Sequence, residues 1–298
     1  MSFPDKQDIP HRSPVQPHEL TLDAEIQFDC HAGISCFNAC CKQSDIQLTP
    51  YDIIRLKERL GMQSAAFVAR YTVPFEMDHH GMPGLKLATA AGSRECVFLG
   101  EAGCTVYADR PLACRYYALG KMAMRRVGGA KVENVYFVVK EVHCKGHDEP
   151  VRQTVRSYLA SQGVAEYDEA NREWMDIVVR KRSAGPSIGA PSARSLQLFD
   201  MCSYDIDGFR NFIEGSGFTD IFDVPEDELA DMLASDTRLL AFAMRFLKQV
   251  LFGEETIPLK PGAREARATA RKAAWAKRRQ VELEAHRQAP EAEKILHD

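Results

Sequence analysis

The chain has 298 residues, of which 45% are hydrophobic and 27% are charged, and its formal net charge is −4. This composition is typical of a globular protein with one large or two ordinary domains, and the charge gives no reason to expect that the whole chain binds nucleic acid. The sequence has no apolar signal segment and no run of about 18 apolar residues, so we expect no membrane span, a cytoplasmic location and reduced thiols.

The chain begins with a polar, proline-rich stretch that has no periodicity, and we interpret residues 1–27 as a flexible arm. The sequence LTPYDIIRLKERLGM then predicts a helix of about three turns. Thr49 is a favourable N-cap, Pro50 suits the first helical position and Gly61 is a typical C-terminal stop. The following SAAFVARY predicts a second, shorter helix with Ser64 as its cap.

The pattern changes between residues 85 and 143, where short runs rich in β-branched and aromatic residues alternate with glycines. LKLATA, ECVFL, CTVY and NVYFVVKEV are the runs that favour strands. Because these runs are short and interrupted, we expect a small, loop-rich β region here.

Helical patterns return after residue 150, in VRQTVRSYLASQGV and YDEANREWMDIVVRKR, and continue over residues 196–253 after the linker SAGPSIGAPSA. The apolar spacing of LLAFAMRFLKQVLF predicts a core helix. The remaining tail is rich in Ala, Arg, Lys and Glu with few large apolar residues, so it can be helical but cannot bury a core. Its basic stretch ARKAAWAKRR offers a surface for a protein partner or RNA, although a solvated or disordered helix is the simpler interpretation.

These segments predict an α+β protein with four parts. The fold class is a small loop-rich β region, stapled by a cysteine metal site, with mostly helical additions. The parts are a flexible arm (1–27), a cysteine-cluster metal-binding domain (28–150), a helical region (151–256) and a charged, loosely ordered tail (257–298).

The sequence concentrates eight of its nine cysteines between residues 30 and 144. In a reducing compartment such a density is typical of metal ligands or redox groups rather than disulfides. Four cysteines within twelve residues fit an ordinary buried core segment poorly, whereas Cys202 fits a packing residue on a helix face. We therefore expect metal ligation by Cys30, Cys36, Cys40, Cys41, Cys96, Cys104, Cys114 and Cys144.

The spacing of these cysteines leaves the number of sites open. Their intervals match neither a zinc finger nor a ferredoxin, but eight thiols complete two four-ligand sites, or one site and a redox pair. Cys40 and Cys41 are adjacent, and successive side chains point apart. One of these two is therefore expected to ligate a different site from the other or to lie beside the ligands.

Charged and imidazole side chains lie next to the later cysteines. Arg110 and Arg115 flank Cys114, where guanidinium groups would offset thiolate charge and donate hydrogen bonds to sulfur; an ordinary surface salt bridge is the alternative. His143 and His147 flank Cys144, and an imidazole can replace a thiolate, although an exposed or structural histidine is the more common case.

The sequences CFNACC, CTVYADRPLACR and a later Cys-x-Gly resemble the YkgJ-type cysteine-cluster family, also named for its Cys-x2-Cys-x2-Cys-Cys signature. The resemblance covers roughly residues 28–147, and its most specific part is the block from Cys104 to Arg115. The first cluster here has intervals of five and three instead of two and two. The resemblance implies a zinc- or iron-chelating domain. A flagellin lysine N-methylase with a similar motif is associated with an iron–sulfur cluster, which favours that cofactor here.

Three functions follow from these observations. The first is an iron–sulfur protein with a redox or cluster-dependent enzymatic role, favoured by thiolate-only ligation and the adjacent arginines. The second is a Zn²⁺-stapled structural or interaction module without catalysis, since short β runs bury little core by themselves. The third is a metal-free thiol redox protein, which the absence of any Cys-x-x-Cys pair disfavours.

Overall fold

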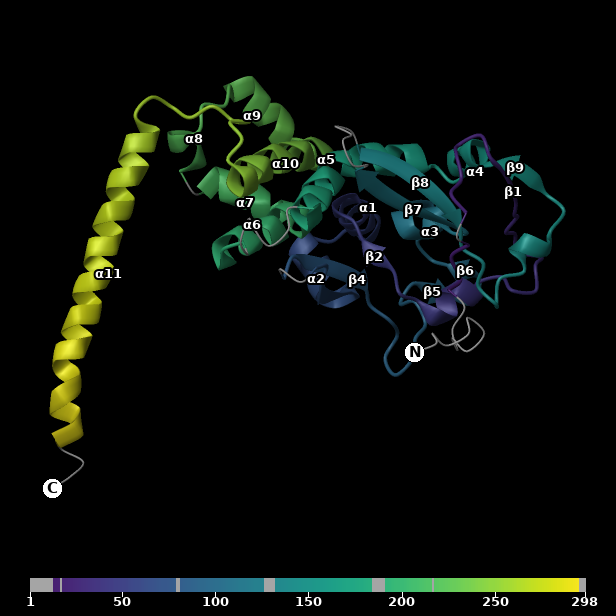
Figure 1. Cartoon of the computed structure of the whole chain (residues 1–298), viewed down its shortest axis with the longest axis horizontal. Helices are drawn as coiled ribbons and strands as arrows, with labels where there is room; N and C mark the ends of the chain where they lie inside the picture. The colour runs from purple at the N-terminus through teal and green to yellow at the C-terminus, as the bar shows by residue number, and fades with distance from the viewer. Residues whose placement is uncertain are drawn as a thin grey trace, which may run out of the picture.

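The structure is a computed structural model that describes residues 13–16, 18–78, 81–125, 132–183, 191–215 and 217–294. Helices account for 53% and strands for 16% of the chain, in small separate sheets, which confirms the α+β class. Figure 1 shows the small sheets towards one end, a group of helices towards the other, and one long helix that projects from the helical end. The expectations for residues 1–12, for residues 184–190 of the linker and for the last four residues of the tail lie outside the described residues.

The first predicted helix is confirmed as α1 (Pro50–Leu60). Thr49 caps it through a capping box in which its side chain accepts from the backbone N–H of Asp52 while the Asp52 carboxylate accepts from the N–H of Thr49. Gly61 ends the helix with φ 62°, a left-handed conformation that glycine adopts without steric cost.

The second predicted helix is α2 (Ser64–Tyr71), but the expected cap was wrong. Gln63 is the N-cap and makes no side-chain capping bond. The Ser64 backbone N–H instead donates to Asp207 at 2.7 Å, and its hydroxyl donates to Asp205. Carboxylates from a distant segment therefore satisfy the start of α2, a contact that local sequence cannot reveal.

Four antiparallel sheets make up the β structure of the described residues. In one, β4 (Pro83–Leu87) lies between β2 (Gln47–Leu48) and β3 (Thr72–Glu76). The other three are two-stranded and consist of β1 (Glu25–Gln27) with β9 (Arg152–Thr154), β5 (Leu99–Gly100) with β6 (Gly103–Cys104), and β7 (Leu119–Arg125) with β8 (Val132–Val138).

The strand predictions are confirmed in part. LKLATA and NVYFVVKEV contribute to β4 and β8, whereas ECVFL and CTVY form only the two-residue ladder of β5 and β6, followed by a 3-10 turn at Tyr107–Asp109. The sequence of β7, LGKMAMR, contains no β-branched residue, so the composition gave no signal for it.

The helical half is largely as predicted. It comprises α4 (Val155–Ser161), α5 (Val164–Ser183), α6 (Ala193–Tyr204), α7 (Ile206–Gly215), α8 (Phe218–Ile221), α9 (Glu226–Leu233), α10 (Asp236–Phe252) and α11 (Ala263–Lys294). A further helix that was not predicted, α3 (Leu112–Tyr116), lies inside the β region. The helix expected from residue 151 starts only at Val155, because Arg152–Thr154 pair with β1.

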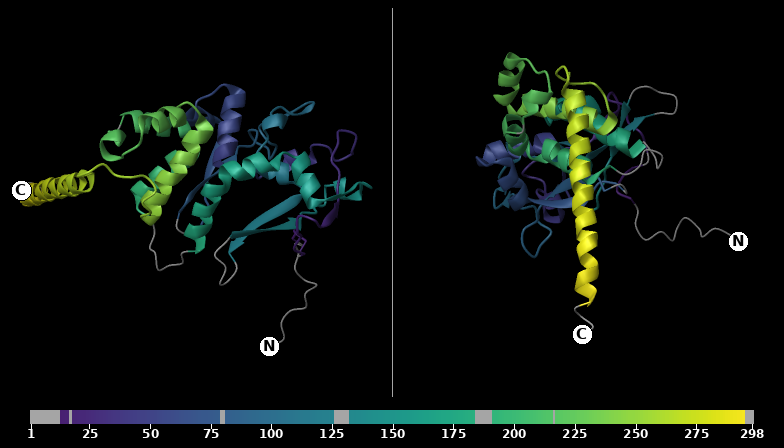
Figure 2. Two further views of the ribbon diagram at one scale, coloured as in Figure 1. Left: turned by 90° about the horizontal axis from the view of Figure 1, so that it is seen from above. Right: turned by 90° about the vertical axis from the view of Figure 1, so that its left-hand side faces the viewer.

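The core runs through both halves of the molecule. In α10, Leu239 and Leu247 are fully buried, which confirms the predicted core helix, and Cys202 on α6 is also fully buried, as expected of a packing residue. In contrast, α11 projects away from the rest of the chain (Figure 2). Its Trp275 is exposed. Among the described residues, no helix combines the length and apolarity needed to cross a membrane.

Candidate metal centre

Five separate segments carry the eight predicted cysteine ligands. Residues 28–44 contain the first four, and the last two of these lie in the 3-10 turn η1 (Ala39–Gln43). Cys96 forms a β-bridge with Thr89, Cys104 ends β6, Cys114 lies on α3, and Cys144 precedes the turn η3 (Gly146–Asp148). All eight are free thiols.

The thiols of Cys30, Cys36 and Cys144, here called the first group, are neighbours. Burial and the nearby thiols of Cys40, Cys36 and Cys144 raise the pKa of Cys30 to about 11. The backbone N–H of Lys145 donates to the Cys36 sulfur at 3.1 Å. An N–H aimed at sulfur is the kind of donor that supports a metal-bound thiolate, so the chain that follows Cys144 provides such support to Cys36.

The thiols of Cys41, Cys96, Cys104 and Cys114, here called the second group, are also neighbours. Burial raises the pKa of Cys114, and the neighbouring Cys96, Cys40 and Cys104 thiols raise it further. The Cys96 N–H donates to the Cys41 carbonyl at 2.7 Å, which holds these two segments together. Mutual repulsion between thiolates is the electrostatic condition that a bound cation relieves.

Cys40 lies between the two groups. Its sulfur is 4.0 Å from that of Cys41, and the hydrogen bond between the two thiols lowers the pKa of Cys40 to about 7. The charge of Cys40 raises the pKa of Cys30 in the first group and of every thiol in the second group. The turn that presents Cys40 starts at Asn38, whose φ of 64° is a left-handed conformation that asparagine tolerates.

The thiols are neighbours without converging on one point. Among the described residues, no three His, Cys, Asp or Glu side chains are close enough together to hold a metal ion as they stand. The structure therefore brings the eight predicted cysteines into one region but leaves their division among sites undetermined.

Two buried hydroxyl groups beside these sulfurs were not predicted from the sequence. The Ser44 and Tyr117 hydroxyls are buried and have no hydrogen-bond partner of standard geometry among the described residues. Burial raises the pKa of Cys96, and the Phe98 N–H and the Ser44 hydroxyl oppose that rise. Burial, the Cys144 thiol and the Glu141 carboxylate raise the pKa of Tyr117.

These two unpartnered hydroxyls could each donate a hydrogen bond to a thiolate. A buried hydroxyl without a partner is costly, and a metal-bound thiolate is an acceptor that removes the cost. No sequence signal identifies Ser44 or Tyr117, because each reaches its sulfur from an isolated position. With the eight thiols and the Lys145 N–H, they form a donor and ligand set that suits a thiophilic metal.

The two arginines next to Cys114 have different environments. Arg110 lies over the Tyr107 ring. Burial raises the pKa of Cys104, and the Arg110 charge offsets part of that rise. Arg115 is buried and donates to the carbonyl oxygens of Arg110, Ala108 and Gln162 and to the Tyr167 hydroxyl. Arg115 thus fixes the loop before α3, while Arg110 supplies positive charge near a thiol.

The histidines around Cys144 differ: His147 has a partner outside the cysteine groups, whereas the buried Nε2 of His143 has no hydrogen-bond partner among the described residues. His147 lies 3.0 Å from the Val139 carbonyl oxygen and packs against the Phe28 ring. His143 lies 3.5 Å from the Glu141 carboxylate. The neighbours that act on the thiols of both groups are chiefly other thiols, so ligation by cysteine alone remains the simpler prediction.

Comparison with protein families gives a match over the cysteine region. Residues 29–145 match the model of the CxxCxxCC family, whose description is "Putative zinc- or iron-chelating domain". A comparison with curated proteins and one with solved structures gave no match. The matched segment contains every cysteine of the two groups together with Cys40, and it ends directly after Cys144. Residues 29–145 are therefore similar to the CxxCxxCC family, and this similarity supports metal binding by the cysteine region.

Proposed function

We propose that the protein holds an iron–sulfur cluster through cysteine thiolates, and that the cluster serves a redox or cluster-dependent reaction. The observation that carries the proposal is the neighbourhood of the eight thiols, each of which lies within electrostatic reach of others while hydrogen-bond donors face the sulfurs of Cys36 and Cys96. Thiolate ligation supported by N–H and O–H donors is the protein environment that tunes iron–sulfur potentials.

The ligands divide most simply into two sets. The first group and Cys40 supply four thiolates, and the second group supplies four more. This division assigns the adjacent Cys40 and Cys41, whose sulfurs lie 4.0 Å apart, to different sets that meet at this pair. When bound, an iron–sulfur cluster supplies one-electron chemistry; the surrounding chain contributes the Arg110 charge and the hydroxyls of Ser44 and Tyr117.

Zinc is the second candidate, and a specific observation favours it. In residues 28–44, Phe28 and Ile34 are the large side chains that are buried among the described residues, and η1 buries none. A segment with so little core gains order from a metal that crosslinks it, as structural zinc sites do. Under this alternative the domain is an interaction module without catalysis, and α11 is a surface for a protein partner.

One preparation separates the two candidates. The full chain is purified without oxygen, and iron, acid-labile sulfide and zinc are quantified per chain together with the visible absorbance spectrum. We expect iron and sulfide in equal amounts and a broad absorbance near 400 nm, typical of iron–sulfur proteins. Stoichiometric zinc in a colourless protein would establish the alternative, and a metal-free folded protein would exclude both.

A cysteine outside the two groups provides the matched control. Cys202 is fully buried in α6, so Cys202→Ala removes a thiol from the chain without touching either group. We expect this variant to keep its full metal content. Cys40→Ser is expected to lose metal, because Cys40 lies between the groups and acts on both.

A further inference from the structure

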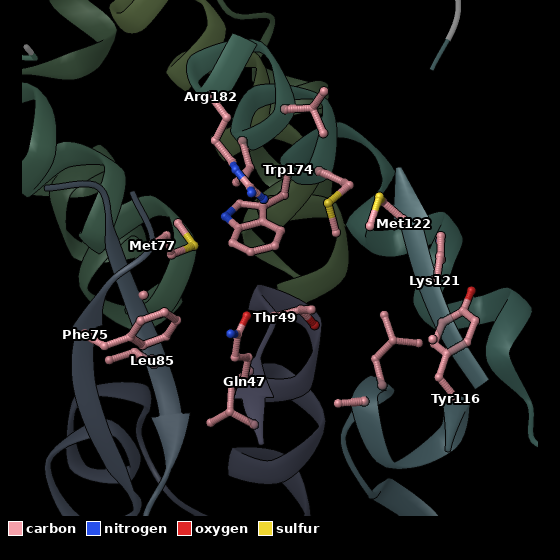
Figure 3. Close-up of a pocket in the computed structure, with 18 of the residues that line it drawn as sticks. Gln47, Thr49, Phe75, Met77, Leu85, Tyr116, Lys121, Met122, Trp174 and Arg182 are labelled. Carbon is pink, nitrogen blue, oxygen red and sulfur yellow. The ribbon is translucent and has the colours of Figure 1, made fainter. Parts of the chain in front are cut away.

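A large open cleft lies on the side of α3 that carries no cysteine. Its volume is about 980 Å³, at the upper end of the range typical of small-molecule sites. Figure 3 shows that its walls come from β3 and β4 on one side, α3 and β7 on the other, the start of α1 below, and α5 above. The cleft therefore lies where the β region meets the helical half.

The walls of this cleft are mainly apolar and adaptable. Phe75 and Leu85 face Trp174 across it, and the thioethers of Met77, Met122 and Met175 complete the lining. Methionine side chains adjust to irregular apolar ligands, so these walls suit an apolar body without a fixed shape.

A glycine of β4 keeps two of these side chains in the cleft. A Cβ atom added at Gly84 would lie 2.7 Å from the Phe75 ring and 2.6 Å from Met77 Cγ. Any larger residue would therefore displace the part of the wall that these two side chains form.

The charged residues of the cleft are all basic. Lys121 and Arg182 line it, and no Asp or Glu is among the described lining residues. Lys121 is already neutralised by Asp168 at 2.8 Å. Arg182 is exposed near the C-terminal end of α5, and within the described parts of the chain it has no carboxylate partner. An apolar cleft with one unpaired guanidinium is complementary to a molecule with an apolar body and one negative charge.

We propose that this cleft binds a small organic anion, with its acidic group at Arg182 and its apolar body between Trp174, Met122 and Phe75. A guanidinium presents parallel N–H donors that match a carboxylate. The site is independent of the metal proposed above, although Leu112 and Ala113 of its floor directly precede Cys114 on α3.

Trp174 provides a reporter inside the cleft. The chain has two tryptophans, and the other, Trp275, is 76% exposed on α11. In a Trp275→Phe protein, purified with its metal, emission therefore reports Trp174 alone. We expect octanoate to change this emission saturably, and 1-octanol, which has the same chain without the charge, to bind more weakly.

Charge-altering variants then test the role of Arg182. Arg182→Gln is expected to weaken octanoate binding roughly tenfold, the effect of one charge-assisted hydrogen bond, and to leave octanol binding unchanged. Met122→Glu places a carboxylate at a half-exposed wall position and is expected to reject octanoate in the same way. Arg59→Gln removes an exposed arginine of α1 outside the cleft and is expected to have no effect.

Three results would overturn the proposal: no saturable response to octanoate, equal binding of octanoate and octanol, or equal affinity in Arg182→Gln and Arg59→Gln. Equal binding of the two probes would show an apolar cavity without anion selectivity. Because the readout is Trp174 emission, these outcomes leave the metal content, and with it the proposed function, to be decided separately.

Discussion

The carboxylate of Asp52 accepts a hydrogen bond from the backbone N–H of Leu112 at 2.8 Å, and so joins the start of α1 to the start of α3. Its other oxygen accepts from the Thr49 N–H at 2.7 Å and the Thr49 hydroxyl at 2.8 Å. Asp52 is fully buried. Since α3 carries Cys114, the position of this thiol depends on a carboxylate whose place in the sequence indicates only a favourable charge at a helix start.

Asp52→Asn is expected to change how stability depends on pH. Burial raises the pKa of Asp52 to about 6, against an ordinary value of 3.8. The folded state favours the protonated form of Asp52. Its contribution to the free energy of unfolding is therefore complete below about pH 4 and is lost as the pH rises through 6, a change of up to about 3 kcal/mol. Urea unfolding between pH 4.5 and 7.5 should show this decline in the parent protein and not in the variant; parallel curves would contradict it.

Lys57→Met is expected to destabilise the protein by about 3 kcal/mol, because it leaves the largely buried Asp207 carboxylate without its cation, while Asp236 keeps only its pair with Arg210. The ammonium group of Lys57 is 2.9 Å from both oxygens of Asp207 and 2.6 Å from Asp236, and its side chain is only 8% exposed. Urea denaturation at neutral pH measures the loss.

The control for Lys57 is an exposed pair. Arg172 bonds to Glu169 on α5 with both side chains about two-thirds exposed, so Arg172→Met is expected to cost under about 1 kcal/mol. Similar losses in the two variants would show that burial does not govern the Lys57 network.

The features of the fold that were predicted correctly depend on residues that are close together in the sequence. The capping residues Thr49 and Gly61 bound α1 as expected, and the apolar spacing of α10 identified a core helix. Ser64 was predicted to cap α2, but Asp205 and Asp207 bind the start of this helix instead. Asp207 belongs to α7 and Asp205 directly precedes it, so both are far from Ser64 in the sequence.

The candidate site was also predicted only in part. Composition was sufficient to select the eight cysteines as candidate ligands, because so dense a group of reduced thiols is typical of metal sites. Their grouping was not predictable, because Cys41 becomes a neighbour of Cys114 only when η1 packs beside α3. No sequence pattern identifies Ser44 or Tyr117. The cleft beside Trp174 was not predictable either, because it forms only when folding places residues of α5, β4 and β7 around one space.

Paired cysteine variants test the division into two groups. Cys30→Ser with Cys144→Ser alters the first group, and Cys104→Ser with Cys114→Ser alters the second. We expect each double variant to retain about half of the parent's metal, because the other set keeps its four thiolates. Metal and sulfide analysis of anaerobically purified protein measures this. Complete loss in both variants would indicate one shared site.

Tyr117→Phe tests whether a buried hydroxyl supports the metal-bound thiolate of Cys144. We expect the variant to bind metal but to show a lower reduction potential by spectroelectrochemistry, because a hydrogen bond to a ligating sulfur favours the more negative, reduced state. If the metal is zinc, loss of the Tyr117 hydroxyl should appear as faster release of zinc to a chelator. Tyr107→Phe is the control, since Tyr107 is 59% exposed and lies under Arg110. Equal behaviour of the two variants would mean that the Tyr117 hydroxyl does not act on the site, and the burial of an unpartnered group there would need another cause.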